Sequence, residues 1–322
     1  MAGGKERTLR RRIKSVQSTK KITKAMELIA ASRIVKAQQR VAAARPYAER
    51  ITEVIRNLAA AGAGGGSPLL VERDEVNTVA FVVVSADRGL CGAYNSSVIR
   101  QTEREMQALR AQGKETRLVT IGKKAMAYFR FRGWPIEQTF LGFSEQPSYQ
   151  DAKAVADYVV ERFEAGEYDQ VQLVFTQFLS AGTQRVVTRR FVPLDASMLE
   201  QASDGPSADY EFEPNPQEIL DRLLPRYAEA RLYAALLDGA ASELAARQRA
   251  MKSATDNAEE LITKYTRAMN RARQDAITTE IMEIVGGAEA LRAAKAGHGD
   301  LLIDHALFSA DVLSDQLESA RR

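Results

Sequence analysis

Cysteine, histidine and long apolar runs are scarce in this 322-residue chain. Its one cysteine, Cys91, excludes an internal disulfide and a two-cysteine redox switch, and is typical of a reducing compartment. No run of 18 apolar residues is present, so the sequence predicts no membrane-spanning helix. The start is basic and lacks an apolar signal-peptide core, and we interpret it as the beginning of a mature helix.

Side chains that could carry catalysis are equally scarce. The two histidines, His298 and His305, are seven residues apart near the end of the chain, and without a third strong ligand they would make a poor metal site. No histidine lies near Cys91 in the sequence, and no serine–histidine–aspartate set or paired-carboxylate site can be assembled. We therefore expect no catalytic residue, no metal and no cofactor.

A glycine-containing segment, residues 87–92, lies between an expected strand and an expected helix, where a nucleotide-binding fold would place phosphate. Its spacing is neither Gly-x-Gly-x-x-Gly nor a loop ending in Gly-Lys-Ser/Thr. The sequence favours a tight structural turn built from Asp87, Arg88, Gly89 and Gly92.

The chain does contain two long helical repeats, at residues 8–58 and 223–276. In both, apolar residues recur at alternating spacings of four and three, which keeps one seam facing a partner helix and predicts a coiled coil. The seam turns polar at Lys20, Thr23 and Glu27, while Ile22, Met26 and Ile29 make a second apolar stripe, which predicts contacts on several sides. Residues 1–57 carry 15 Lys/Arg against 4 Asp/Glu, a net charge of +11, which indicates either a solvated face or a surface for an acidic partner.

Between the helical repeats, apolar β-branched runs alternate with helical patterns, which predicts a mostly parallel sheet. Strands are expected at 79–85, 116–121, 136–140, 171–178 and 185–193, the last two joined as a hairpin, and helices at 95–111, 123–132 and 151–165. The expected fold class is α/β: a long antiparallel coiled coil of the terminal helices plus a Rossmann-like central domain. The expected parts are a helix at 1–60, a linker at 61–77, the α/β domain at 78–195, a loop at 196–216, a helix at 217–294 and an extension at 295–322.

These patterns leave three functions open: a rotary shaft, a Rossmann-type enzyme with a helical clamp, and a coiled-coil adaptor for nucleic acid. Nucleotide binding by the middle domain would favour the second, and steeply salt-dependent binding to DNA or RNA the third. No aromatic interleaving or base-reading motif supports nucleic acid.

Four segments, in order, resemble the gamma subunit of F-type ATP synthases, in a bacterial, actinobacterial-like form. They are RIKSVQSTKKITKAMELIAASR at 12–33, SADRGLCGAYN at 85–95, RAMKSATDN at 249–257 and ITTEIMEIVGGA at 277–288. The resemblance, which covers roughly residues 5–294, implies a central-stalk rotor subunit without an active site. It implies alpha, beta, epsilon and c-ring subunits as partners, no nucleic acid, and a peripheral place on the cytoplasmic face of the bacterial cell membrane.

The resemblance also implies roles for individual residues. Contacts to beta subunits are carried over to Met26, Arg247, Arg273, Gln274 and Thr278, and contacts at the foot, near epsilon and the c-ring, to Tyr210 and Phe212. Members of the family usually end soon after the position of Ala288, whereas this chain continues through residues 295–322, where helical spacing of apolar residues predicts an amphipathic helix.

Overall fold

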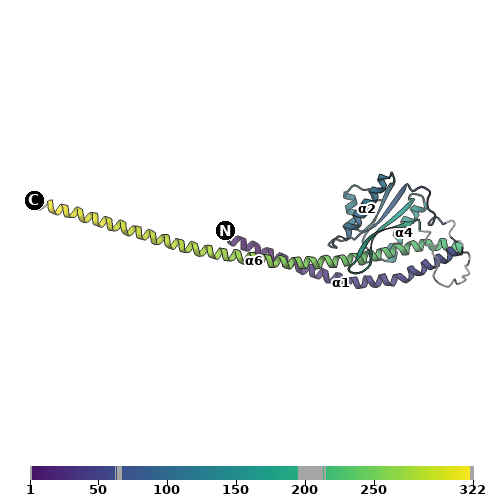
Figure 1. Ribbon diagram of the computed structural model, residues 1–322, viewed down its shortest axis with the longest axis horizontal. Coiled ribbons are helices and arrows are strands. Elements are labelled where there is room, and N and C mark those ends of the chain that lie inside the picture. The colour runs from purple at the N-terminus through teal and green to yellow at the C-terminus, as the bar shows by residue number, and fades with distance from the viewer. Residues whose placement is uncertain (1, 62, 64–66, 195–212, 214, 320–322) are drawn as a thin grey trace. The chain divides into compact units, whose positions relative to one another are not determined.

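The computed structural model describes the backbone of residues 2–61, 63, 67–194, 213 and 215–319, and side chains within those ranges except for residues 2, 3, 60 and 296–319. It divides into two compact units, one of residues 21–255 and one of residues 1–20 with 256–322. In order, the elements are α1 (Ala2–Ala60), β1 (Thr78–Val84), α2 (Tyr94–Ala111), β2 (Glu115–Ile121), α3 (Lys123–Phe131), β3 (Gln138–Phe140), α4 (Tyr149–Glu164), β4 (Gln170–Phe178), β5 (Gln184–Val192) and α6 (Pro216–Ser319) (Figure 1).

Both terminal helices are long and unbroken. Helix α1 has 59 residues and continues through Pro46, and α6 has 104 residues and continues through Pro225. Proline removes one backbone donor from a helix, yet packing along an apolar face can hold the helix together across it. Helix α6 also passes through Gly286 and Gly287 and beyond residue 294.

A five-stranded sheet, in the order β3-β2-β1-β4-β5, lies in the unit of residues 21–255. The pairs β3–β2, β2–β1 and β1–β4 are parallel, and β4–β5 is the antiparallel hairpin that the sequence predicts. Helix α4 begins where its capping residue Ser148 accepts a hydrogen bond from the backbone N–H of Asp151, in a reciprocal capping box.

Side chains alternate across the buried strand β1 and so fill two cores. Ala80, Val82 and Val84 belong to a cluster with residues of α1, α4 and α6. Val79 and Phe81 belong to a second cluster with residues of α2 and α3. The period of two places successive residues on opposite faces, so a strand covered on both sides is apolar throughout, as the sequence predicts for this run.

Within the same unit, α1 and α6 lie side by side and run antiparallel (Figure 1). Thr23 contacts Thr255, and Ile34 packs with Leu244. The α1 residues nearest its C-terminus, including Leu58, share the main core with the first turns of α6. This order confirms the predicted antiparallel pairing of the terminal helices.

In the other unit, the first turns of α1 and the part of α6 after residue 255 are also paired. The Lys20 ammonium lies 3.0 Å from the Glu259 carboxylate. Lys5 lines a charged groove together with α6 residues between Glu259 and Asp275. Ala272 is buried on this part of α6, as its seam position predicts.

Candidate functional site

The turn at residues 87–92 is organised by the carboxylate of Asp87. One oxygen accepts the backbone N–H of Lys123 at 3.1 Å, and the other accepts the N–H of Gly142 at 3.0 Å and the hydroxyl of Ser144 at 2.9 Å. The Asp87 N–H in turn donates to the Ser144 hydroxyl at 2.9 Å. Asp87 therefore ties together the segments that follow β1, β2 and β3, which supports a structural role for the turn.

The backbone of this turn differs from a turn that uses two glycines. Left-handed φ angles occur at Leu90 (64°) and Gly92 (57°), whereas none occurs at Gly89. Leucine rarely adopts this conformation, because its Cβ crowds the following carbonyl. Gly89 therefore takes part in the turn without a left-handed φ, and its carbonyl oxygen accepts a hydrogen bond from α6.

That carbonyl fastens the turn to α6. The Arg247 guanidinium donates to the Gly89 oxygen at 2.8 Å and also donates to the Glu243 carboxylate one turn earlier on the helix. Arg247 is 8% exposed and Glu243 2% exposed. We call Gly89, Glu243 and Arg247 the turn latch. It joins the turn at the sheet's carboxyl edge to α6 through the charge-assisted hydrogen bond from Arg247, whose guanidinium is held by the buried ion pair with Glu243 on the same helix.

Burial dominates the electrostatics around the turn latch. It raises the pKa of Glu243, while the Arg247 charge opposes that shift. Burial, followed by the Glu243 charge, also raises the pKa of the Cys91 thiol to about 11. A thiol with so high a pKa is protonated at neutral pH and is a weak nucleophile. The described structure thus gives Cys91 a packing role in the cluster with Ala86 and Tyr94.

Within the polar interruption of the α1 seam, Thr23 contacts α6, whereas Glu27 pairs with Lys24 of its own helix. The hydroxyls of Thr23 and Thr255 are both buried and lie 2.8 Å apart. On the adjoining face of α1, Ile22 and Ile29 are 59% and 53% exposed, and Met26 is half-buried. Two of the three residues of the second apolar stripe are therefore exposed in the unit of residues 21–255.

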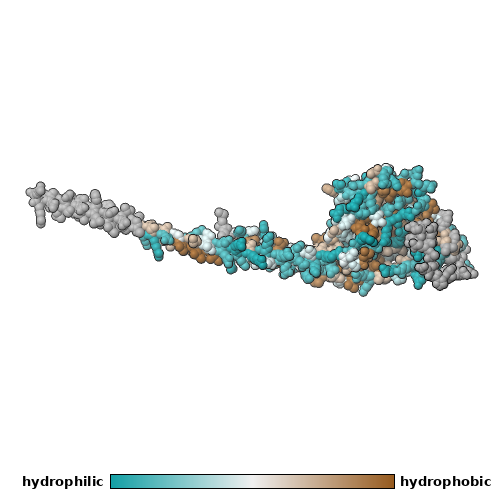
Figure 2. Space-filling model, viewed as in Figure 1, coloured by the Kyte–Doolittle hydropathy of each residue, from teal (hydrophilic) through white to brown (hydrophobic). Residues whose placement is uncertain are grey.

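On α6 beyond residue 272, both polar and apolar side chains are exposed. Arg273, Gln274 and Thr278 are all exposed. The apolar residues that follow are also largely exposed along the helix (Figure 2); they are Ile277, Ile281, Met282, Ile284, Val285 and Leu291. Such a concentration of exposed apolar side chains is typical of a surface that another polypeptide covers.

The remaining residues singled out from the sequence cannot be assigned contacts. Tyr210 and Phe212 lie outside the described residues, and the side chains of His298 and His305 lie in the part of α6 whose side chains are not described. Within the described ranges, no group of three or more histidine, cysteine, aspartate or glutamate residues could hold a metal ion. In the same ranges, no helix is long and apolar enough to cross a membrane.

The fold defines a class of protein in which N- and C-terminal helices pair antiparallel and an α/β sheet domain joins them. Solved structures of this class include a chain from the Euglena gracilis mitochondrial ATP synthase (OSCP/F1/c-ring, rotational state 3), with a TM-score of 0.63 and 22% identity over 91% of this chain and 96% of that one. At that identity the likeness concerns the fold alone.

Sequence comparisons identify the family. The family model described as ATP synthase matches residues 5–291. The ATP synthase gamma chain of Parafrankia sp. is 57% identical over 89% of this chain and 98% of the relative, and that of Frankia casuarinae is 56% identical with the same coverage. The chain belongs to the ATP synthase gamma chain family.

Proposed function

We propose that this chain is the central-stalk rotor subunit of a proton-translocating ATP synthase. It transmits rotation of the membrane c-ring to the catalytic hexamer of alpha and beta subunits, and it has no active site of its own. The observation that carries this proposal is the construction of α6. The helix is locked to the sheet domain by the turn latch and continues, without a break, into a segment with exposed apolar side chains.

A rotor subunit needs a rigid contact between its domain and its long helix, so that torque is transmitted. It also needs an exposed surface that neighbouring subunits can contact. The first need is met by a buried contact, because the Arg247 guanidinium, held by Glu243 on the same helix, donates a charge-assisted hydrogen bond to the turn of the sheet domain. The second is met by exposed side chains around α6 near residues 277–291, which would be covered by surrounding subunits. Both features lie on one continuous helix.

Contacts with the beta subunits are assigned to Met26, Arg273, Gln274 and Thr278. Met26 adjoins the exposed Ile22 and Ile29, so a lever segment of a beta subunit could pack there. Arg273, Gln274 and Thr278 are exposed and offer a guanidinium, an amide and a hydroxyl for hydrogen bonds that form and break during rotation.

Arg247 and the foot residues Tyr210 and Phe212 are proposed to act in other ways. Because Arg247 is buried in the turn latch, its part in coupling is to position the turn, so that a contact with a beta subunit would run through Arg88, which is 70% exposed at its side chain. Tyr210 and Phe212 are proposed to contact the epsilon subunit and the c-ring, because the resemblance to the family implies that role for them.

The charge distribution suits these partners. The net charge of +11 on residues 1–57 would attract acidic segments of the catalytic subunits over a range of about 8–10 Å at physiological salt. Such attraction favours association without fixing one orientation. We further propose that the chain acts at the cytoplasmic face of the bacterial cell membrane as a peripheral subunit.

Affinity capture of the tagged full-length chain from its host tests this function. We expect alpha, beta and epsilon subunits to co-purify, with ATP hydrolysis in the captured complex and none in the chain alone. A matched variant in which Ile281, Ile284 and Val285 are changed to aspartate should capture less of the alpha and beta subunits. Capture of the chain without these subunits, or with nucleic acid in their place, would contradict the proposal.

A further inference from the structure

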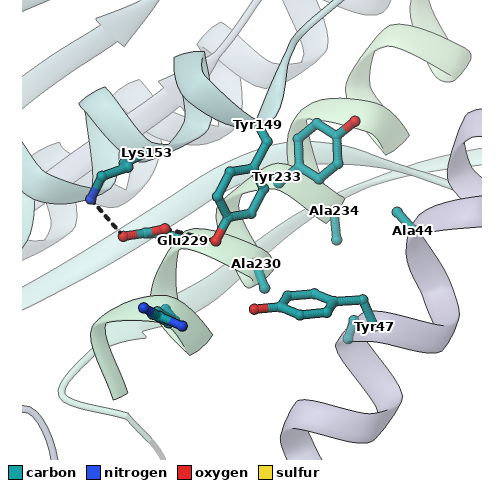
Figure 3. Close-up of a pocket in the computed structure, with 10 residues that line it drawn as sticks. Ala44, Tyr47, Tyr149, Lys153, Glu229, Ala230, Tyr233 and Ala234 are labelled. Atoms are coloured by element: carbon teal, nitrogen blue, oxygen red, sulfur yellow. Dashed lines mark hydrogen bonds and ion pairs between the residues drawn. The ribbon is translucent and has the colours of Figure 1, made fainter. Parts of the chain in front are cut away.

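A pocket of about 610 Å³ lies between α1, α4 and α6, on a part of the molecule that the proposed coupling contacts do not use (Figure 3). We call it the tyrosine pocket. Its lining residues all belong to the unit of residues 21–255. They are Ala44, Tyr47, Ala48, Tyr149, Lys153, Arg226, Glu229, Ala230, Tyr233 and Ala234.

The apolar part of the tyrosine pocket is a slot with aromatic walls. Tyr47 from α1 and Tyr149 from α4 approach each other through their hydroxyls at one side of the pocket, and the Tyr149 hydroxyl points toward Glu229 (Figure 3). The Tyr149 ring is braced edge-on by Tyr233, with centroids 5.7 Å apart and planes at 73°. Alanines from α1 and α6 complete the lining, and their small side chains leave room for a flat ring.

At the polar end, the Glu229 carboxylate is already satisfied. It is 6% exposed, accepts the Tyr149 hydroxyl at 2.7 Å through one oxygen, and accepts the Lys153 ammonium at 2.9 Å through the other. Lys153 also donates to Asp157 at 3.1 Å. Burial and the bond to Glu229 raise the pKa of Tyr149, which keeps this tyrosine a neutral donor. The buried carboxylate therefore has little left to offer a cationic ligand.

Unlike the Glu229 carboxylate, the Arg226 guanidinium is available to a ligand. It lines the pocket, is exposed, and forms no ion pair with any carboxylate of the described residues. Among the lining residues, the charges of Lys153 and Arg226 exceed that of Glu229 by one positive charge. A guanidinium presents five donors in a planar fork, which matches a carboxylate or sulfonate.

We propose that the tyrosine pocket binds a small aromatic anion. The ligand ring packs against the alanines and against the side chains of Tyr47 and Tyr149, and the anionic group pairs with Arg226. A volume of about 610 Å³ accommodates two or three fused rings with a substituent. Because the lining comes from three elements, the bound ligand joins α1 to α4 and α6 and stabilises the folded chain.

Titration of the full-length chain with naphthalene probes tests this proposal. We expect 2-naphthoate to bind saturably with a Kd below about 1 mM, and the cation 2-naphthylmethylammonium to bind at least about tenfold more weakly. Binding should also raise the Tm of the chain. Equal affinity for the two probes, or no saturable binding of naphthoate, would overturn the proposal.

Variants separate the two parts of the pocket. Arg226→Gln should weaken naphthoate binding about tenfold while leaving the neutral analogue 2-naphthalenemethanol unaffected. Arg222→Gln, one turn earlier on α6 and outside the lining, is the matched control and should change neither affinity. Ala234→Leu should abolish binding by filling the slot, and Tyr47→Ala, at a half-exposed wall, gives an independent loss if the leucine variant does not fold.

Repeating the titration on the assembled ATP synthase distinguishes a ligand site from a subunit contact. Retained naphthoate binding supports the proposal. Loss of binding on assembly would mean that a partner polypeptide fills the tyrosine pocket, and would overturn it. Neither result depends on rotation, so a failure here is distinct from a failure of the rotor function.

Discussion

The hydroxyls of Thr23 and Thr255 lie 2.8 Å apart in the buried seam between α1 and α6, although 232 residues separate them in the chain. The Thr255 hydroxyl also donates to the Met251 carbonyl of its own helix. This pair favours one register of the two helices, because a shifted register would lose the hydrogen bond between the two buried hydroxyls.

The first prediction concerns the turn latch. Arg247→Met leaves the Glu243 charge buried without its cation, and should lower the free energy of unfolding by about 3–5 kcal/mol. Replacing both residues by methionine should recover much of that loss. Urea unfolding of the full chain measures both effects. Arg222→Met, which breaks the exposed pair with Glu218 on the same helix, is the control and should cost less than about 1 kcal/mol.

The second prediction concerns Met26. Met26→Lys places a cation beside the exposed stripe that we assign to a beta-subunit contact, and should leave ATP hydrolysis largely present while lowering ATP-driven proton pumping. The two rates are compared in membrane vesicles containing the assembled enzyme. Leu28→Lys, at a position that is 58% exposed, provides the control. An unchanged ratio of pumping to hydrolysis would show that Met26 does not make the proposed contact with a beta subunit.

The third prediction concerns the polar groups that follow the seam of α6. Replacing Arg273 and Gln274 together by alanine removes several hydrogen-bond donors and should slow turnover or impair assembly. Steady-state ATP hydrolysis and the yield of intact complex report the effect. The double replacement of Arg104 and Gln107, exposed on α2, is a matched control. Normal turnover and yield would show that Arg273 and Gln274 do not contact the catalytic subunits.

The fourth prediction concerns pH. Burial raises the pKa of Asp238 from 3.8 to about 6, although Arg189, the Phe178 backbone and Arg45 favour its charged form. Between these values the folded chain binds more protons than the unfolded chain, so this group's contribution to stability falls as pH rises from about 4 to 6. Asp238→Asn should therefore stabilise the chain at pH 8 by about 1–2 kcal/mol and have little effect near pH 4.

Urea unfolding at the two pH values checks this prediction. Asp221→Asn, at an exposed position on the same helix, is the matched control variant. Equal stabilisation by Asp238→Asn at both values would mean that the charge of Asp238 does not oppose folding.

Local periodicity in the sequence predicts most of the fold. The seam residues Ala30, Ile34 and Leu244 are buried, and the apolar run around Val82 forms the central strand. These predictions succeed because side-chain spacing of 3.5 or 2 residues directly reports which face of an element is covered.

The sequence could not predict pairings between distant segments. Nothing near Thr23 indicates Thr255, and nothing near Arg247 indicates that the Gly89 carbonyl receives its guanidinium. The tyrosine pocket was missed for the same reason, because Tyr47 and Tyr149 meet only through the packing of α1 against α4 and α6. For the Thr23–Thr255 pair, the sequence did contain one signal: a polar residue at a seam position of α1 implies a polar partner on the facing helix.

The most direct test of the central claim uses the Thr23–Thr255 pair. In a chain with Cys91→Ser, cysteines introduced at positions 23 and 255 should form a disulfide, because their neighbouring helices already bring the side chains into contact. A bead attached to the α/β domain of this cross-linked chain, in an immobilised complex, is observed after ATP is added. If α1 and α6 turn as one body with the domain, the bead rotates at the same rate before and after the disulfide is reduced. A bead that stays still while the complex hydrolyses ATP would contradict the account.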